Sequence, residues 1–204
     1  MAYTPTTTRQ AARATGLKIL CYGQAGTGKT VLCSTTGCPS ETLVISCEAG
    51  LLSLRDLPDM PCAEVKTIAE IREVYDFLRA GEHAFRWVCL DSVSEIAEVV
   101  LAHEKRASKD PRAAYGALAD HMFATLRLFR DLPLHVYFSA KLSETQDEER
   151  KRARFAPSMP GKMLTQGIAY LFDEVFALRV ERDADGTPSR WLLTGPDGQY
   201  EAKD

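Results

Sequence analysis

The stretch from Gly23 to Thr30 has residue types and spacing suited to binding a chain of phosphates. It reads Gly-Gln-Ala-Gly-Thr-Gly-Lys-Thr and fits the phosphate-binding loop pattern G-x-x-x-x-G-K-[ST] at every fixed position. Glycines let successive backbone N–H groups turn inward, so such a loop holds several negative charges without a cage of cations. Lys29 is the expected contact to the β- and γ-phosphates, and the Thr30 hydroxyl is an expected Mg²⁺ ligand. The cofactors that we expect are therefore ATP and Mg²⁺.

The flanks of this loop support the same prediction. Residues 17–22 form a short apolar run of strand type, and residues 30–35 have the character of the helix that follows such a loop. A glycine turn with an exposed lysine is the alternative, which the flanking strand and helix make less favoured. The expected nucleotide site consists of Gly23, Gln24, Ala25, Gly26, Thr27, Gly28, Lys29, Thr30 and Val31.

Glu48 stands at the carboxyl end of a predicted buried strand, residues 42–47, one strand from the phosphate loop. Open α/β sheets place their chemistry at the carboxyl ends of strands. We therefore expect Glu48 to polarise the water that attacks the γ-phosphate, so that Glu48 and Lys29 are the catalytic residues. A solvated loop carboxylate is the alternative reading of this position.

Asp91 closes the next predicted buried strand, which begins at Phe85. A strand of this kind that ends in an acid resembles a Walker B strand, and we expect Asp91 to hold the Mg²⁺ shell opposite Thr30. The alternative is that Asp91 caps the following helix. Residues 92–95 already fit a capping box, however, so the helix does not require Asp91.

Length and composition predict one domain and give the chain no strong overall charge. The 204 residues carry 25 Lys and Arg against 28 Asp and Glu, so contact with nucleic acid has to come from local basic clusters. We expect a flexible arm over residues 1–16 and a single domain over residues 17–204. Because no apolar run is long enough for a membrane span or a signal peptide, we expect a soluble cytoplasmic protein.

The six cysteines favour reduced thiols, because three of them lie in strand-like runs where cysteine acts as a small apolar residue. A zinc site built from Cys33, Cys38 and Cys62 is the alternative, although these residues lack the paired C-x-x-C spacing.

The remaining pattern predicts a three-layer α/β fold. Residues 68–78 have helical apolar spacing, further helices start after Ser92 and Asp110, and residues 134–140 form another buried strand. Residues 174–182 and 190–195 are typical of a terminal β-hairpin. We expect a mostly parallel sheet with this antiparallel hairpin at its C-terminal end.

Two basic stretches are candidates for contact with single-stranded DNA. The first covers residues 105–112, and the second lies within residues 141–160, which have no apolar period and predict a structureless functional loop. Basic side chains neutralise phosphates and an aromatic ring stacks on a base. A solvated charged loop is the alternative. The candidate DNA-binding residues are Lys105, Arg106, Lys109, Arg112, Arg150, Lys151, Arg152, Arg154 and Phe155.

In this order, the phosphate loop, the two acids at strand ends, Pro160-Gly161-Lys162 and the terminal hairpin resemble the core-only RecA-like ATPases of phages. That group includes single-strand annealing recombinases, and the resemblance covers residues 17–204. It implies that Glu48 is the catalytic glutamate and that residues 105–112 and 141–162 are DNA-contact loops. Residues 139–141 read Ser-Ala-Lys where RecA has a polar amide sensor, which is a departure from the pattern.

The resemblance implies an ATP-dependent single-stranded DNA-binding recombinase or annealing protein of phage homologous recombination, with ATP hydrolysis stimulated by single-stranded DNA. The location would then be the cytoplasm of the bacterial host. We expect a ring or filament of identical chains, because the chain lacks a clear second cation for the γ-phosphate, and a single-strand-binding protein is a further candidate partner. The alternatives are another RecA-like motor, such as a small helicase or a circadian-type ATPase module, or a P-loop small-molecule kinase that uses residues 150–154 as a lid.

Overall fold

The computed structural model describes residues 5–10, 16–48, 50–147 and 151–204, and the statements below concern these residues. Most of the expected arm, residues 1–16, lies outside them, as does Arg150, one of the candidate DNA-binding residues.

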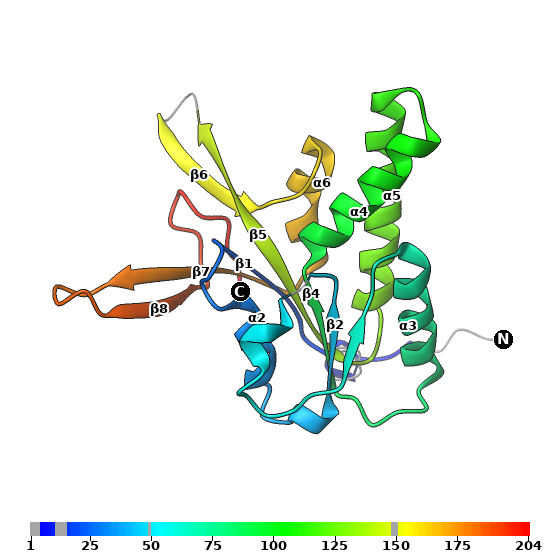
Figure 1. The fold of residues 1–204 in the computed structure, drawn as a ribbon, viewed down its shortest axis with the longest axis horizontal. Coiled ribbons are helices and arrows are strands. Elements are labelled where there is room, and N and C mark those ends of the chain that lie inside the picture. Colours follow the sequence, from blue (N-terminus) through cyan, green and yellow to red (C-terminus); the bar gives the residue numbers. More distant parts are fainter. Residues whose placement is uncertain (1–4, 11–15, 49, 148–150) are drawn as a thin grey trace.

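An eight-stranded sheet forms the centre of the described structure, and seven of its strands follow the order β3-β2-β4-β5-β1-β7-β8 (Figure 1). Neighbours from β3 to β7 are parallel, β8 pairs antiparallel with β7, and β6 pairs antiparallel with the far part of β5. This confirms the predicted mostly parallel sheet with a C-terminal antiparallel hairpin. The strands are β1 (Lys18–Gly23), β2 (Thr42–Ser46), β3 (Cys62–Glu64), β4 (Trp87–Asp91), β5 (His135–Asp147), β6 (Arg152–Pro157), β7 (Glu174–Arg182) and β8 (Pro188–Leu193).

Apolar clusters cover both faces of the sheet. Successive side chains of one strand point to opposite faces, so they join different clusters. In β1, Leu20 and Tyr22 join the larger core cluster, whereas Cys21 between them joins a smaller cluster with Cys33 and Cys89. All three are fully buried. Of the three cysteines in the predicted strand-like runs, Cys21 and Cys89 thus pack as small apolar residues, whereas Cys47 is only partly buried.

The larger cluster lies under the longer helices, which begin where the sequence predicts. Thr67 and Glu70 form a capping box at the start of α3, Ser92 caps α4, and Asp110 caps α5, whose first residue is Pro111. None of the helices in the described ranges combines the length and apolar character needed to cross a bilayer. The helices are α2 (Lys29–Leu32), α3 (Ile68–Ala80), α4 (Val93–Ala107), α5 (Pro111–Arg130) and α6 (Lys162–Gly167).

The expectation of a structureless loop over residues 141–160 is wrong. Strand β5 continues to Asp147 and pairs with β6 in a ladder from Leu142 opposite Pro157 to Asp147 opposite Arg152. In β6, exposed Arg152 and Arg154 alternate with partly buried neighbours, so the charges occupy one face of a strand. This period of two is one of charge and exposure, so the spacing of apolar residues alone does not reveal it.

The C-terminal segment ties this hairpin to the main sheet. Tyr200 forms a bridge to Phe155 on one side, and Lys203 forms a bridge to Val175 of β7 on the other. The Tyr22 hydroxyl of β1 donates to the carbonyl oxygen of Glu201 over 2.8 Å. The β5–β6 hairpin is therefore anchored to the strand that precedes the phosphate loop.

Candidate nucleotide site

A cavity of about 420 Å³ lies above the phosphate loop at the carboxyl edge of the sheet. Its walls come from the loop, from the segment after β2, from the end of β4, from β5 and from β8. The lining residues are Ala25, Gly26, Gly28, Lys29, Thr30, Val31, Glu48, Ser53, Asp91, Ser92, Lys141 and Arg190. Most of the predicted nucleotide-binding residues, both predicted catalytic residues and both predicted metal ligands thus meet in one place.

The other three predicted loop residues, Gly23, Gln24 and Thr27, do not line the cavity, but their hydrogen bonds hold the loop in shape. The Lys29 Nζ donates to the carbonyl oxygens of Gly23 and Gln24 over 2.9 and 2.8 Å, and the Thr27 hydroxyl donates to Gln24 over 2.9 Å. Gly28 has φ 104°, a left-handed conformation that favours glycine. Burial lowers the pKa of the Lys29 ammonium, although Asp91 acts in the opposite direction.

Thr30 and Asp91 lie in direct contact, as expected for two ligands of one ion. The Thr30 Oγ1 donates to Asp91 Oδ2 over 2.7 Å, and the Ser139 hydroxyl of β5 donates to the other carboxylate oxygen. Asp91 is buried and does not cap α4, which has Ser92 as its cap. One hydroxyl and one carboxylate oxygen fit Mg²⁺, which usually takes its other ligands from phosphates and water. The cysteines of the alternative zinc site form no metal-binding group within the described residues.

Glu48 reaches this site by a route that differs from the expected one. In the sheet, β4 and β5 stand between β2 and β1, so Glu48 is not one strand from the phosphate loop. Strand β2 instead pairs with β4, where Ser46 lies opposite Asp91 and the Cys47 amide donates to the Asp91 carbonyl over 2.8 Å. This pairing places Glu48 beside Asp91.

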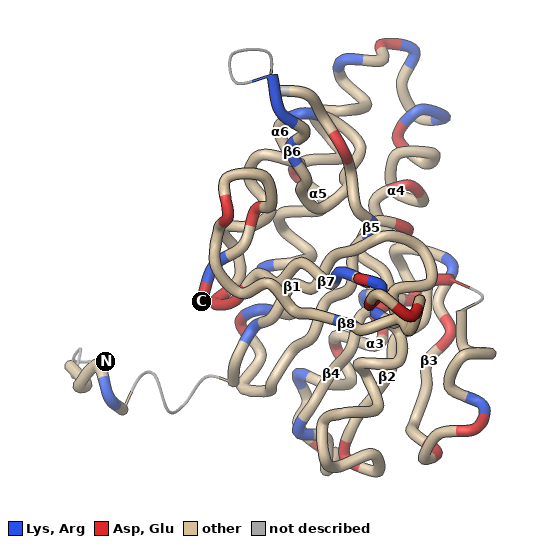
Figure 2. Tube along the Cα trace, turned by 90° about the vertical axis from the view of Figure 1, so that its left-hand side faces the viewer, with Lys and Arg blue, Asp and Glu red and all other residues tan. Residues whose placement is uncertain are grey.

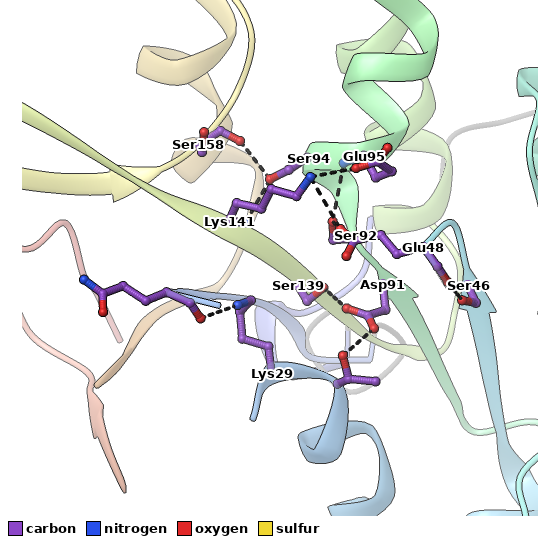
Figure 3. A network of polar contacts seen from close by, with 12 residues as sticks. Lys29, Ser46, Glu48, Asp91, Ser92, Ser94, Glu95, Ser139, Lys141 and Ser158 are labelled. Carbon is purple, nitrogen blue, oxygen red and sulfur yellow. Dashed lines mark hydrogen bonds and ion pairs between the residues drawn. The ribbon is translucent and has the colours of Figure 1, made fainter. Parts of the chain in front are cut away.

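The Glu48 carboxylate is held by two neighbours (Figure 3). It accepts a hydrogen bond from the Ser92 hydroxyl, and its Oε1 lies 3.8 Å from the Lys141 Nζ. Lys141 also donates to Glu95 over 2.6 Å, and this bond raises the pKa of the lysine. The carboxylate therefore has a fixed position at the wall of the cavity.

Lys141 is the first of two residues of the cavity that the sequence did not assign to the nucleotide site, because the sequence marked it only as the start of a predicted loop and as part of the departure at residues 139–141. Its amide donates to the Ser94 hydroxyl over 2.9 Å, which in turn donates to the Ser158 carbonyl over 2.8 Å (Figure 3). The sequence does hold a signal that Lys141 belongs to the site. Lys141 follows Ser139 by two positions on one strand, so the two side chains share a face of the sheet.

Arg190 is the second missed residue. It lies on β8, and its Nε donates a hydrogen bond of 3.0 Å to the Thr27 carbonyl oxygen. The two residues are 163 positions apart in the sequence. Because β7 pairs with β1, the terminal hairpin lies next to the phosphate loop. The expectation that the chain lacks a second cation near the phosphates is wrong, since Lys141 and Arg190 both line the cavity.

The two basic stretches project from the same end of the molecule, beyond the carboxyl ends of the strands (Figures 1 and 2). Lys105, Arg106, Lys109 and Arg112 surround the turn from α4 to α5, while Lys151, Arg152 and Arg154 lie at and after the β5–β6 turn. Phe155 is not a free stacking surface, because its half-buried ring stacks on Tyr200 with centroids 4.5 Å apart.

A groove of about 640 Å³ runs between the β5–β6 hairpin and α6. It offers two cations, Arg154 and Lys162, and the ring of Tyr170, which is 84% exposed. The sequence analysis missed Tyr170 because it sits in an apolar run whose other members, Ile168 and Leu171 among them, are buried. The groove is lined by Ser143, Thr145, Arg154, Ala156, Lys162, Thr165, Gln166, Tyr170 and Glu201.

Comparison with known proteins places this arrangement in context. The family profile described as an AAA domain matches residues 15–204. Among solved structures, a KaiC-like protein from the hyperthermophilic archaeon Pyrococcus horikoshii OT3 is similar, with a TM-score of 0.56 and 13% sequence identity over 88% of this chain and 78% of that chain. A likeness at this identity concerns the fold. Among curated protein sequences no significant match was found.

Proposed function

Because the chain belongs to the AAA domain family and has the fold of a RecA-like P-loop ATPase, we propose that it hydrolyses ATP and acts on single-stranded DNA. Its role would be that of a recombinase or annealing protein in homologous recombination of the phage type. The proposal has two parts, the ATPase site and the DNA surface, and each is supported by different residues.

In the ATPase part, the loop amides and Lys29 bind the phosphates. Thr30 and Asp91, whose oxygens lie 2.7 Å apart, would hold Mg²⁺, which supplies charge neutralisation when it is bound. Glu48 accepts a proton from the attacking water, and its hydrogen bond from Ser92 and its ion pair with Lys141 orient the carboxylate before nucleotide arrives.

The observation that carries the DNA part is the course of one strand. Strand β5 contacts Asp91 through Ser139, lines the cavity through Lys141 and then continues directly into the basic β5–β6 hairpin. Its pairing changes from β1 to β6 between Lys141 and Leu142. A molecule that uses ATP to act on a charged polymer needs such a connection between the two sites.

The groove beside this hairpin suits a single strand better than a duplex. Arg154 and Lys162 would neutralise backbone phosphates, and the exposed Tyr170 ring would stack on an unpaired base. Hydroxyl and amide groups of Thr165 and Gln166 add polar contacts. In a duplex the bases are stacked on one another, so a protruding ring has no free base face to meet.

We also propose assembly into a ring or filament of identical chains on DNA, with a single-strand-binding protein as a further partner. The resemblance to RecA-like proteins supports assembly. A neighbouring chain is not needed to supply a second cation, because Lys141 and Arg190 reach the cavity of their own chain. Light scattering with and without ATP and DNA tests this, and full ATPase activity at strictly monomeric mass would contradict it.

The decisive test measures ATP hydrolysis by the full chain alone, with single-stranded DNA, with duplex DNA and with a panel of nucleosides and nucleoside monophosphates. We expect stimulation by single-stranded DNA and no phosphoryl transfer to a small acceptor. Lys29→Ala serves as the control for contaminating ATPases. Annealing of complementary strands without unwinding of a duplex would separate this role from that of a helicase. Transfer of phosphate to a nucleoside, with no response to DNA, would replace the proposal by a kinase.

A further inference from the structure

We propose that Arg190 is a phosphate ligand of the nucleotide site in its own chain, supplied by the terminal hairpin. This inference rests on the proposed nucleotide binding and assigns a residue to it that lies outside the phosphate-loop motif.

The first support is the position of the guanidinium. The Arg190 Nε donates to the Thr27 carbonyl over 3.0 Å, and Arg190 lines the same cavity as Lys29 and Thr30. A β-carbon placed on Gly28 would lie 3.4 Å from Arg190 Nε. This is an ordinary contact distance, so the guanidinium lies directly against the loop at Gly28, whose left-handed backbone conformation favours glycine.

The second support is the charge that remains available at this position. Among the described residues, Lys141 is paired with Glu95 and Glu48, whereas Arg190 has no carboxylate oxygen within 4.0 Å. A guanidinium has five N–H donors, and the contact with Thr27 uses one of them. An exposed cation without an acidic partner, beside a loop shaped for phosphates, matches an anionic ligand in charge and in donor geometry.

The third support is the anchoring of β8. Strand β7 pairs with β1 up to Leu178 opposite Gly23, and β8 continues from β7 with Arg190 opposite Val180. The loop follows β1 and the arginine lies on β8, so the two are carried by one sheet with only β7 between their strands. The arginine contacts the loop backbone and not Glu48 or Asp91, so we expect it to bind ATP and ADP about equally and to contribute little to the chemical step.

The test measures the affinities of the full chain for Mg²⁺-ATP and Mg²⁺-ADP by calorimetry, without DNA, for Arg190→Ala and Arg190→Lys. We expect Arg190→Ala to weaken both affinities by about tenfold to a hundredfold, the range for losing charge-assisted hydrogen bonds, with Arg190→Lys in between. Arg182→Ala is the matched control, because Arg182 is an exposed arginine of the same hairpin that bonds to Gly186. It should bind both nucleotides like the wild type.

Mixing distinguishes a ligand in the same chain from one supplied by a neighbour. Lys29→Ala has an intact Arg190 but a defective loop, and Arg190→Ala has the reverse. If Arg190 acted across an interface, a mixture would regain hydrolysis at low ATP, which would overturn the assignment to the same chain. We expect no recovery.

The controls separate this inference from the proposed function. If the wild-type chain bound no nucleotide, the proposed function and the inference would both fall. If the wild type bound ATP normally and Arg190→Ala bound both nucleotides with unchanged affinity, the inference alone would be lost. If Arg190→Ala melts well below the wild type, the affinities of Arg190→Lys decide whether the inference holds, because this variant retains a cation on the same strand. Wild-type affinities in Arg190→Ala would overturn the inference, as would affinities in a folded Arg190→Lys that do not differ from those of the wild type.

Discussion

The nucleotide cavity and the basic end of the molecule are built in opposite ways. In the cavity, Thr30, Asp91 and Ser139 are locked to one another by hydrogen bonds, and Asp91 is 5% exposed. At the basic end, Lys151 and Arg152 are exposed, and the Lys105 ammonium lies over the Tyr115 ring, 5.4 Å from its centroid. Hydrolysis requires groups held in fixed geometry, whereas a flexible polyanion is neutralised by charges that remain in water.

This difference predicts two classes of variant. Changes in the cavity should alter the rate of hydrolysis whether or not DNA is present. Changes at the basic end should alter DNA affinity and leave basal hydrolysis unchanged. A cavity variant that changed only DNA affinity, or a variant of the basic end that changed basal hydrolysis, would show that the two regions are not functionally separate.

The largest effect is expected for Lys29→Ala, which should reduce hydrolysis to background because the γ-phosphate loses its main point charge. Phosphate release with and without single-stranded DNA measures it. The change also removes two hydrogen bonds to Gly23 and Gln24, so thermal unfolding should be followed in parallel. Wild-type turnover in a folded Lys29→Ala protein would rule out the phosphate-loop assignment.

Glu48→Gln should lower hydrolysis by about two orders of magnitude or more, the scale for losing a general base, with nucleotide affinity retained. The amide keeps the shape of the carboxylate but accepts a proton poorly. Glu98→Gln is the control, because Glu98 is an exposed carboxylate on α4, one turn beyond Glu95. An unchanged rate in Glu48→Gln would move the base to another residue.

Replacing Lys151, Arg152 and Arg154 together by alanine should weaken single-stranded DNA binding at all sequences alike. Each phosphate contact contributes about 0.7 to the slope of log affinity against log salt, so the slope should fall by about 2. At 0.1 M salt this change in slope corresponds to a loss of affinity for single-stranded DNA of roughly a hundredfold. Fluorescence anisotropy across a salt series measures it, and Arg79→Ala on α3 is the control. An unaltered slope would mean that the hairpin is an ordinary solvated surface.

Tyr170→Ala should have the smallest effect, a loss of about 1–3 kcal/mol of binding free energy with no change in salt slope, because stacking releases no counterions. Phe155→Ala provides the contrast. Its ring is already stacked on Tyr200, so we expect it to lower the melting temperature more than the DNA affinity. The opposite ranking of the two variants would return the stacking role to Phe155.

The sequence by itself determined the parts that depend on neighbouring residues. The phosphate loop is one contiguous segment, and the roles of its glycines, Lys29 and Thr30 follow from local backbone geometry. The strand that ends at Asp91 and the cap at Ser92 follow from short-range pattern in the same way. The α/β class follows from the alternation of such segments, and the sheet confirms it.

The tertiary structure decided what depends on the order of the strands. Glu48 reaches Asp91 because β2 pairs with β4, and Arg190 reaches Thr27 because β7 pairs with β1. The β5–β6 hairpin is held by its backbone ladder, and exposed and partly buried side chains alternate along β6, so no continuous apolar run marks this strand. Whether an aromatic ring is free is settled by what packs against it, so Phe155 is occupied by Tyr200, whereas Tyr170 stands exposed. Apart from the β5–β6 hairpin, whose strands follow one another, these contacts join segments far apart in the chain, and no local pattern encodes which segments the sheet brings together.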